Sequence, residues 1–373
     1  MQKLKDLYNK YPDIFASLQL ILFLYLFLFS LDLMGASLKL FGKEFSETLI
    51  ATTTNPFVGL FIGIIATSVI QSSSSTTSIV VGMVAGGALT IDTAIPIIMG
   101  ANIGTSITNT IASLPQINRS NEFQRAFAAA TVHDFFNFLS VIIIFPLQLA
   151  TNFLGYIATE LEHVFANVGG LAFLSPVKAI TKPVVKALLN YGGEYIADKD
   201  ILAWVMFAIA LAILFLALKY MVSSLKVLVV SKAKAWFDKV LFKTSVRAFL
   251  VGIFLTILVQ SSSITTSLVV PMAGAGLLTL SQIFPYTLGS NIGTTVTAML
   301  ASLITGSDAA VAVAFAHLIF NISGIIIWWP FKKLPILLAE KFAEYSTKSK
   351  IIPVAYVLVL FFIIPVIVIY LAN

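Results

Sequence analysis

The chain contains no cysteine and only three histidines among its 373 residues. The missing cysteine excludes disulfide bonds and thiolate metal sites, and so few histidines argue against a multi-histidine metal centre. Charged residues are also scarce, at 11% of the sequence, whereas soluble domains carry about a quarter. The net charge of +6 is not a nucleic-acid signal, because the basic residues lie in short polar connections. These absences exclude a soluble domain with an ionic surface.

Apolar residues, in contrast, form long runs. Hydrophobic residues make up 58% of the chain, and Phe alone occurs 30 times. Several runs, such as 15–41 and 351–371, reach the roughly 20 residues that a helix needs to cross a bilayer core. Lipid forces each spanning segment to satisfy its own backbone hydrogen bonds. The sequence therefore predicts an all-α polytopic membrane protein.

Three polar motifs occur twice, in the same order. The motif pairs are QSSSSTTS at 71–78 with QSSSITTS at 260–267, GANIGTS at 100–106 with GSNIGTT at 289–295, and His133 with Asn137 against His317 with Asn321. The second copies of the first two motifs both lie 189 positions after the first copies, and the third pair follows after a short deletion. Chance repetition in apolar sequence would not keep this order. The chain therefore consists of two homologous halves.

The basic residues predict opposite orientations for the two halves. Lys3, Lys5 and Lys10 indicate a cytoplasmic N-terminus, because cytoplasmic connections carry the excess of Lys and Arg. The run 15–41 then crosses outward, so the first repeat begins outside. The connection 219–247 carries seven Lys or Arg against one Asp and should be cytoplasmic. The second repeat therefore begins inside, and the two repeats form an inverted pair.

The repeats and the polar connections divide the chain into segments. In each half the apolar runs beside the serine block are too short to span separately, so we expect a broken or re-entrant helix there. The predicted segments are a cytoplasmic N-terminus at 1–14, a first transport repeat with its preceding helix at 15–150, an interfacial or external connection at 151–200, a second repeat with its preceding helix at 201–330, and a C-terminal helix region at 331–373.

The serine blocks have the chemistry of an ion site. Where a helix breaks, orphan N–H groups favour an anion and orphan carbonyls favour a cation. Ser, Thr, Gln and Asn supply donors for an oxyanion and oxygen ligands for sodium without a permanent charge in the membrane. Hydroxyl groups also serve close helix packing, and Asn-Ile-Gly-Thr also suits a turn or a cap. A serine block directly after a glutamine, found twice at equivalent positions, exceeds what packing needs.

Asp134 is the one acid in the apolar run 126–149. An intramembrane carboxylate is a functional candidate, and the alternative is a structural pair with His133 or Arg125. The second copy has Leu318 at the matching position, so the acid breaks the symmetry and could create an additional cation site. The two repeated histidines are expected to pack helices or support ligands rather than to bind ions themselves.

In combination these motifs resemble the type II sodium-dependent phosphate cotransporter family. The resemblance rests on both QSSS blocks, both Asn-Ile-Gly-Thr segments and His-Asp-Phe-Phe-Asn, and it covers roughly 55–146 and 245–330. The large disulfide-bearing external loop of animal members is missing, which agrees with the absence of cysteine. The soluble PhoU-like domain that many bacterial relatives append does not follow either. We therefore expect a bacterial member without a C-terminal PhoU-like domain.

The resemblance implies two sets of ligands. The implied phosphate ligands are Ser72, Ser73, Ser74, Gln260, Ser261, Ser262 and Ser263. The expected sodium ligands, which combine family positions with neighbouring groups of the same motifs, are Gln71, Thr76, Thr77, Asn102, Thr105, Thr110, Gln116, Asp134, Asn137, Thr265, Thr266, Ser290, Asn291, Thr294, Thr297 and Asn321. Asp134 matches the family acid associated with an extra sodium site and electrogenic transport. Arg119 stands where the family often has an acid.

The sequence therefore predicts a sodium-coupled symporter that imports inorganic phosphate by alternating access, with both ions bound between the repeats near the membrane midplane. The expected partners are phosphate, sodium and the lipid bilayer of the cell's inner membrane, with no nucleic acid, no cofactor beyond sodium and no transition metal. A homo-oligomer stays open. The alternatives are a sodium symporter for sulfate, arsenate or a carboxylate, and an anion channel. A membrane enzyme has the least support, because the sequence offers no nucleophile–base pair.

Overall fold

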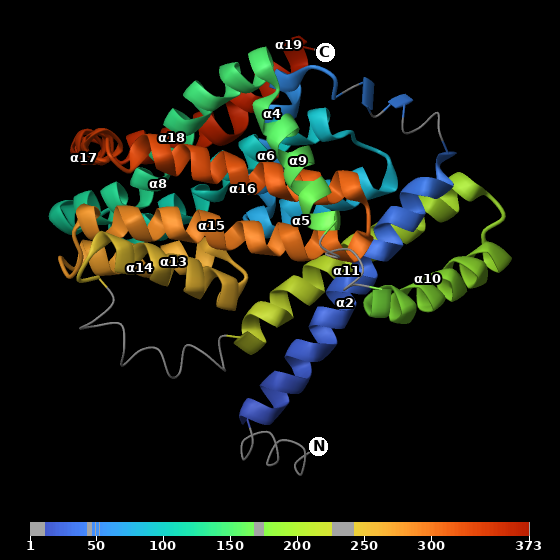
Figure 1. Ribbon diagram of the computed structural model, residues 1–373. Coiled ribbons are helices and arrows are strands. Elements are labelled where there is room, and N and C mark those ends of the chain that lie inside the picture. The colour runs from blue at the N-terminus through green and yellow to red at the C-terminus, as the bar shows by residue number, and fades with distance from the viewer. Residues whose placement is uncertain are drawn as a thin grey trace.

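A computed structural model describes residues 12–42, 47–48, 50–51, 53–167, 175–225 and 242–372. Every regular element within these residues is a helix (Figure 1), as the apolar runs predicted. Five of the described helical stretches are long and apolar enough to cross a membrane, namely Ile14–Leu40, Ser120–Thr151, Lys199–Tyr220, Asp308–Trp328 and Ile351–Ala372. The last of these contains the run 351–371, which is therefore long and apolar enough for a crossing.

The helices follow the two sequence repeats. The first half contains α2 (Pro12–Leu40), α4 (Pro56–Ile70), α5 (Ser73–Gly86), α6 (Ile91–Thr105), α7 (Ile107–Ser113), the short η1 (Leu114–Gln116) and α8 (Ser120–Thr151). The second half contains α11 (Lys199–Leu225), α13 (Ser245–Val259), α14 (Ser262–Gly274), α15 (Leu280–Thr305) and α16 (Asp308–Trp328). Between the halves lie α9 (Phe153–Asn167) and α10 (Ser175–Tyr195), and the C-terminal region holds α17 (Lys333–Ser346), α18 (Ile351–Leu358), the π-helical η4 (Val359–Ile363) and α19 (Ile364–Ala372).

The two halves exchange helix contacts around their serine blocks. The helix α5 of the first half packs against α15 and α16 of the second, while α14 packs against α7 and α8 of the first. The preceding helices α2 and α11 pack against each other and run diagonally beside the core (Figure 1). Each serine-bearing helix therefore lies between elements of the opposite half, which brings the two sequence motifs into one region.

Glycines let one helix pair in each half come into backbone contact. A Cβ at Gly63 would collide with the carbonyl of Ile97, and a Cβ at Gly252 would collide with the carbonyl of Tyr286. These two glycines are repeat equivalents, and they join α4 to α6 and α13 to α15. Small residues allow such close approach between membrane helices, where packing replaces the hydrophobic driving force.

Gly289→Ala is expected to destabilise the protein by about 1–3 kcal/mol, because the added methyl group overpacks a tight contact. A Cβ at Gly289 would collide with the carbonyl of Phe249 on α13. Thermal unfolding in detergent measures the effect. Gly35→Ala is the matched control, since a Cβ there meets no atom of the described residues within 4 Å. An equal melting temperature for the two variants would contradict the close packing.

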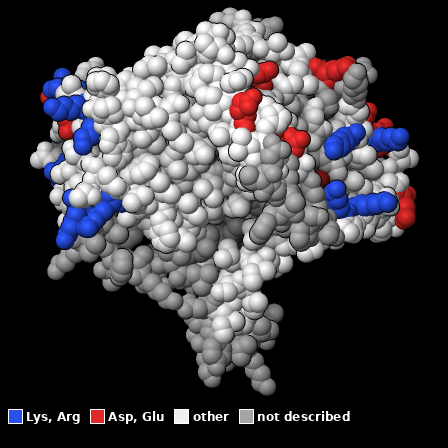
Figure 2. All heavy atoms as spheres, viewed as in Figure 1, with Lys and Arg blue, Asp and Glu red and all other residues white. Residues whose placement is uncertain are grey.

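Charged side chains on the viewed face gather mostly at two opposite sides (Figure 2). In that view, Lys and Arg cluster at the left, where Figure 1 has α17 and the start of α8, and a mixed group lies at the right, over α10. The broad region between them is almost free of charge apart from a few acidic side chains above. Such a band agrees with helices whose sides face lipid.

The break in each half is shorter than the sequence indicated. The block 71–78 was expected to interrupt an apolar stretch, but α5 already begins at Ser73 and includes the remaining hydroxyl residues. Serine and threonine can occupy the first turns of a helix because their side chains bond the free backbone groups there. The predictions for 1–11 and for 226–241, including Lys3, Lys5 and Lys10, lie outside the described residues.

Candidate functional site

Both halves break at the same residue and with the same geometry. The helix α4 is followed by the left-handed C-cap Gln71 (φ 56°, ψ 29°), and α13 by the left-handed C-cap Gln260 (φ 53°, ψ 28°). The following Ser72 and Ser261 are extended, and their hydroxyl oxygens accept the backbone N–H groups of Ser75 and Ile264. Each break is therefore a left-handed glutamine followed by a serine that caps the next helix.

The left-handed glutamines are unusual for a membrane helix. Residues with a side chain lose roughly 1–2 kcal/mol in this conformation, and such strain persists mainly where the surrounding structure fixes it. A glycine would adopt the conformation without cost, yet both halves have glutamine. The side chain at this position therefore has a role that the backbone turn alone does not require.

The two breaks meet. The Ser74 hydroxyl donates to the backbone carbonyl of Gln260 at 3.2 Å, which joins the first serine block to the second break. The Gln260 side chain is itself fixed, because its amide donates to the carbonyl of Ile257 at 2.6 Å and its oxygen accepts from Thr297 at 2.7 Å. Gln71, in contrast, is exposed. The motifs that the sequence paired are thus neighbours in space.

A chain of buried amides runs between the halves beside the breaks. Asn291 donates to Asn137 Oδ1 at 3.0 Å, and Asn137 donates to the carbonyl of Asn102 at 2.7 Å. Asn321 donates to Asn102 Oδ1 at 3.3 Å. His133 Nε2 lies 2.7 Å from Asn291 Oδ1, so Nε2 carries the proton of this contact. Four predicted sodium ligands therefore belong to one connected group.

Sequence reasoning missed Asn109, which extends this group to the second serine helix. Its Oδ1 accepts from Thr266 at 2.8 Å and from Ser267 at 3.2 Å, and its Nδ2 lies 3.4 Å from His133 Nδ1. The equivalent position in the second half is Ala298, so the repeat comparison could not reveal it. The available signal was a second amide in the apolar run 94–114, which follows Asn102 in the same run.

Asp134 is completely buried and bonded on one oxygen only. Its Oδ2 accepts from Tyr356 at 2.9 Å and from Thr110 at 3.3 Å, while Oδ1 has no hydrogen-bond partner among the described residues. The Ser106 hydroxyl also faces the carboxylate, although it donates to the carbonyl of Ile103. His133, one of the two structural partners that the sequence suggested for Asp134, forms a hydrogen bond with Asn291 instead. Neither Ser106 nor Tyr356 was among the predicted site residues.

Most of the predicted hydroxyl ligands donate to a backbone carbonyl one turn earlier in their own helix. This is the case for Thr76, Thr77, Thr105, Thr265, Ser290 and Thr294. A hydroxyl whose proton is used in this way keeps an oxygen lone pair for a cation. These residues therefore remain available as oxygen ligands.

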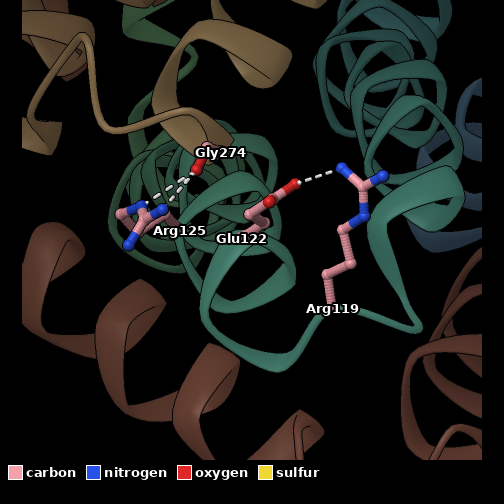
Figure 3. A network of polar contacts seen from close by, with 4 residues as sticks. All are labelled: Arg119, Glu122, Arg125 and Gly274. Atoms are coloured by element: carbon pink, nitrogen blue, oxygen red, sulfur yellow. Dashed lines mark hydrogen bonds and ion pairs between the residues drawn. The ribbon is translucent and has the colours of Figure 1, made fainter.

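Gln116 lies apart from the serine blocks. Its side chain packs near Gly274, at the end of α14 that is opposite to Ser262. Arg125 holds the same end of α14 with bonds of 2.6 and 3.0 Å to the carbonyl of Gly274, and Arg119 pairs with Glu122 at 3.0 Å (Figure 3). A cation at the C-terminal end of a helix complements its dipole. Arg125 was the second structural partner considered for Asp134. It bonds the C-terminal end of α14 instead.

Three contacts at the site have no equivalent in the other half. We call them the latch contacts: Ser74 to the Gln260 carbonyl, Thr297 to the Gln260 side chain, and His133 to Asn291. In the opposite half, the atoms equivalent to Ser74 Oγ, Thr297 Oγ1 and the His133 ring nitrogens are Ser263 Oγ, Thr108 Oγ1 and the His317 ring nitrogens. These equivalent atoms are all buried and lack a hydrogen-bond partner among the described residues. The two halves therefore carry the same polar groups with different hydrogen bonds.

Comparison with known proteins agrees with the motifs. The family model described as Na+/Pi-cotransporter matches residues 26–174 and 207–336, which is most of the chain. No solved structure matches the chain.

Curated relatives match nearly the whole chain. The human sodium-dependent phosphate transport protein 2B is 34% identical over 435 aligned positions, which cover 92% of this chain and 63% of the relative. The sheep sodium-dependent phosphate transport protein 2A is 34% identical over 418 positions, covering 92% of this chain and 65% of the relative. The chain thus spans slightly less than two thirds of the length of these relatives. It belongs to the Na+/Pi-cotransporter family, as its resemblance to the type II sodium-dependent phosphate cotransporters predicted.

Proposed function

We propose that this chain imports inorganic phosphate together with sodium, and that both ions bind between its two halves where the breaks meet. The observation that carries the proposal is the contact of Ser74 with the carbonyl of Gln260. It joins two helix N-termini with identical serine caps, each preceded by the carbonyl end of another helix. The named activity of the relatives, sodium-dependent phosphate transport, supports the same reading.

The helix N-termini are suited to the anion. The first turns of α5 and α14 offer backbone N–H groups and a partial positive charge, which favour phosphate. Ser73, Ser74, Ser262 and Ser263 are buried at these turns, and the Ser263 hydroxyl has no hydrogen-bond partner among the described residues. The proposed phosphate ligands are therefore the predicted ones, Ser72–Ser74 and Gln260–Ser263.

The surrounding oxygens are suited to sodium. The hydroxyl groups of the two Thr-Thr pairs and the amide oxygens beside them provide neutral ligands, and Asp134 adds one buried carboxyl group. Sodium, as a hard cation, takes such oxygen ligands. We propose that Asp134, Thr110 and Ser106 form one sodium site, and that the connected amides with Gln71 and Thr297 contribute to others.

The latch contacts support alternating access. If the two repeats are inverted in the membrane, exchanging their conformations turns an opening on one side into an opening on the other. The exchange would transfer the latch contacts to Ser263, Thr108 and His317, whose polar atoms lack partners among the residues described. Unpaired buried polar groups cost free energy. The exchanged state would gain three hydrogen bonds at these groups and would lose the three latch contacts of the present state.

The remaining topology stays part of the proposal. We infer a cytoplasmic N-terminus in the inner membrane, segment boundaries near residues 150, 200 and 330, and transport as a non-enzymatic process without a cofactor other than sodium. The basic cluster over α17 and the start of α8 agrees with a cytoplasmic face there. Association into a homo-oligomer stays a prediction.

Uptake of radiolabelled phosphate into proteoliposomes tests the function. An inward sodium gradient should drive accumulation above equilibrium, and an equal potassium gradient should not. Excess arsenate, sulfate or a carboxylate added with the label distinguishes among the anions. Entry that never exceeds equilibrium and ignores sodium would replace the symporter with an anion channel, and accumulation of sulfate in place of phosphate would keep the symporter but change its substrate.

A further inference from the structure

We propose that Tyr356 is a positioning residue of the sodium site at Asp134. Tyr356 belongs to α18 in the C-terminal region, outside both sequence repeats. Its hydroxyl donates to Asp134 Oδ2 at 2.9 Å across 222 positions of sequence. The inference rests on the proposed function, because it assigns the carboxylate to sodium. It makes the C-terminal helix part of the transport site.

Three aromatic rings hold the phenol in place. The ring centroid of Tyr356 lies 4.7 Å from that of Phe342 on α17, 5.9 Å from that of Phe361 on η4, and 6.5 Å from that of Phe127 on α8. Such tilted and edge-to-face pairs contribute beyond simple burial. The hydroxyl is therefore directed at Asp134 by a packed aromatic environment and not by a flexible side chain.

The helix that carries Tyr356 is locally distorted. The π-helical turn Val359–Ile363 follows α18 directly, and α19 continues the same segment to pack against α4. A π-turn inserts one residue into the helical repeat, and such turns are frequent at functional sites. The turn lets α18 face α8 with Tyr356 while α19 covers α4, which is the helix that leads to the first break.

The hydrogen bonds divide the carboxylate into two differently used oxygens. Tyr356 and Thr110 both donate to Oδ2, so this oxygen is fixed, and Oδ1 has no hydrogen-bond partner among the described residues. Hydrogen bonds to an ionised group are stronger than bonds to a neutral one. Tyr356 thereby fixes Oδ2 and holds the other oxygen of the Asp134 side chain in one orientation toward a cation.

Sodium-dependent thermal stabilisation of the purified protein measures binding without transport. Tyr356→Phe should raise the sodium concentration for half-maximal stabilisation by about 10- to 100-fold, the effect of losing one hydrogen bond to a charged group. In an Asp134→Asn background the same substitution should cause no further shift. Tyr345→Phe, which changes an exposed tyrosine of α17, should leave the sodium midpoint unchanged.

The outcomes separate this inference from the proposed function. An unchanged sodium midpoint in Tyr356→Phe, or a shift that persists without Asp134, would overturn the positioning role and leave phosphate transport standing. The expected shift in a protein that shows no sodium-driven phosphate uptake would support the site and reject the transported substrate. Wild-type protein that sodium does not stabilise more than potassium would overturn the inference itself.

Discussion

Asp134→Asn is expected to reduce the accumulation of phosphate at a membrane potential of 100 mV by about 50-fold. Moving one charge across 100 mV contributes about 2.3 kcal/mol, and each 1.4 kcal/mol is a factor of about ten. Asp134 is fully buried, and its Oδ1 lacks a partner among the described residues. Without the carboxylate, the sodium bound there should be lost, and one charge fewer should cross in each cycle.

Proteoliposomes with an imposed potassium diffusion potential provide the measurement. The ratio of internal to external phosphate is compared with and without the potential, at a constant sodium gradient. Asp308→Asn is the matched control, because Asp308 is an exposed acid in the first turn of α16. The same voltage dependence in the wild type and in Asp134→Asn would reject Asp134 as a sodium ligand.

His133→Leu and His317→Leu are both expected to slow transport by at least about tenfold, although neither histidine is a proposed ligand. His133 bonds Asn109 and Asn291, and leaving buried polar groups unpaired costs about 1–3 kcal/mol each. The state described here should therefore lose stability in His133→Leu. The ring of His317 has no hydrogen-bond partner among the described residues, so His317→Leu should penalise the opposite state instead.

The maximal rate of sodium-driven uptake at saturating phosphate and sodium reports this effect. Each substitution destabilises one of the two states and so shifts the population toward the other. Transport then slows, because every cycle must pass through both states. Ile322→Leu, an exposed and volume-conserving change on α16, should transport like the wild type. Normal rates in both histidine variants would mean that the latch contacts do not control the cycle.

The sequence predicted the parts of the fold that depend on composition and repetition. Apolar length predicted the spanning helices. The equivalent positions of Gln71 and Gln260 in the two repeats predicted two equivalent breaks, which the φ and ψ angles of both residues bear out. The extent of each break was less accessible. Hydrophobicity cannot distinguish an irregular serine block from a helix whose first turns consist of serine and threonine.

The site was predictable only where the two halves repeat each other. Asn102, Asn137, Asn291 and Asn321 were found by comparing the halves, and they are connected in space. Asn109 and Tyr356 have no counterpart in the other half, and Tyr356 reaches Asp134 from a distant helix, so no local pattern could reveal them. The latch contacts depend on which state the halves adopt, which the sequence does not encode in a single motif.

The most direct test of the account is the labelling rate of one introduced cysteine by a membrane-impermeant thiol reagent. The chain has no cysteine, so Gln71→Cys places a unique thiol at the exposed break, and Tyr370→Cys on the C-terminal helix serves as an exposed control. The account predicts that His133→Leu slows labelling at position 71 by at least about tenfold, because unpaired amides disfavour this state, while His317→Leu leaves it fast. Shifts in the same direction, or no shift in either variant, would contradict alternating access between two equivalent latches.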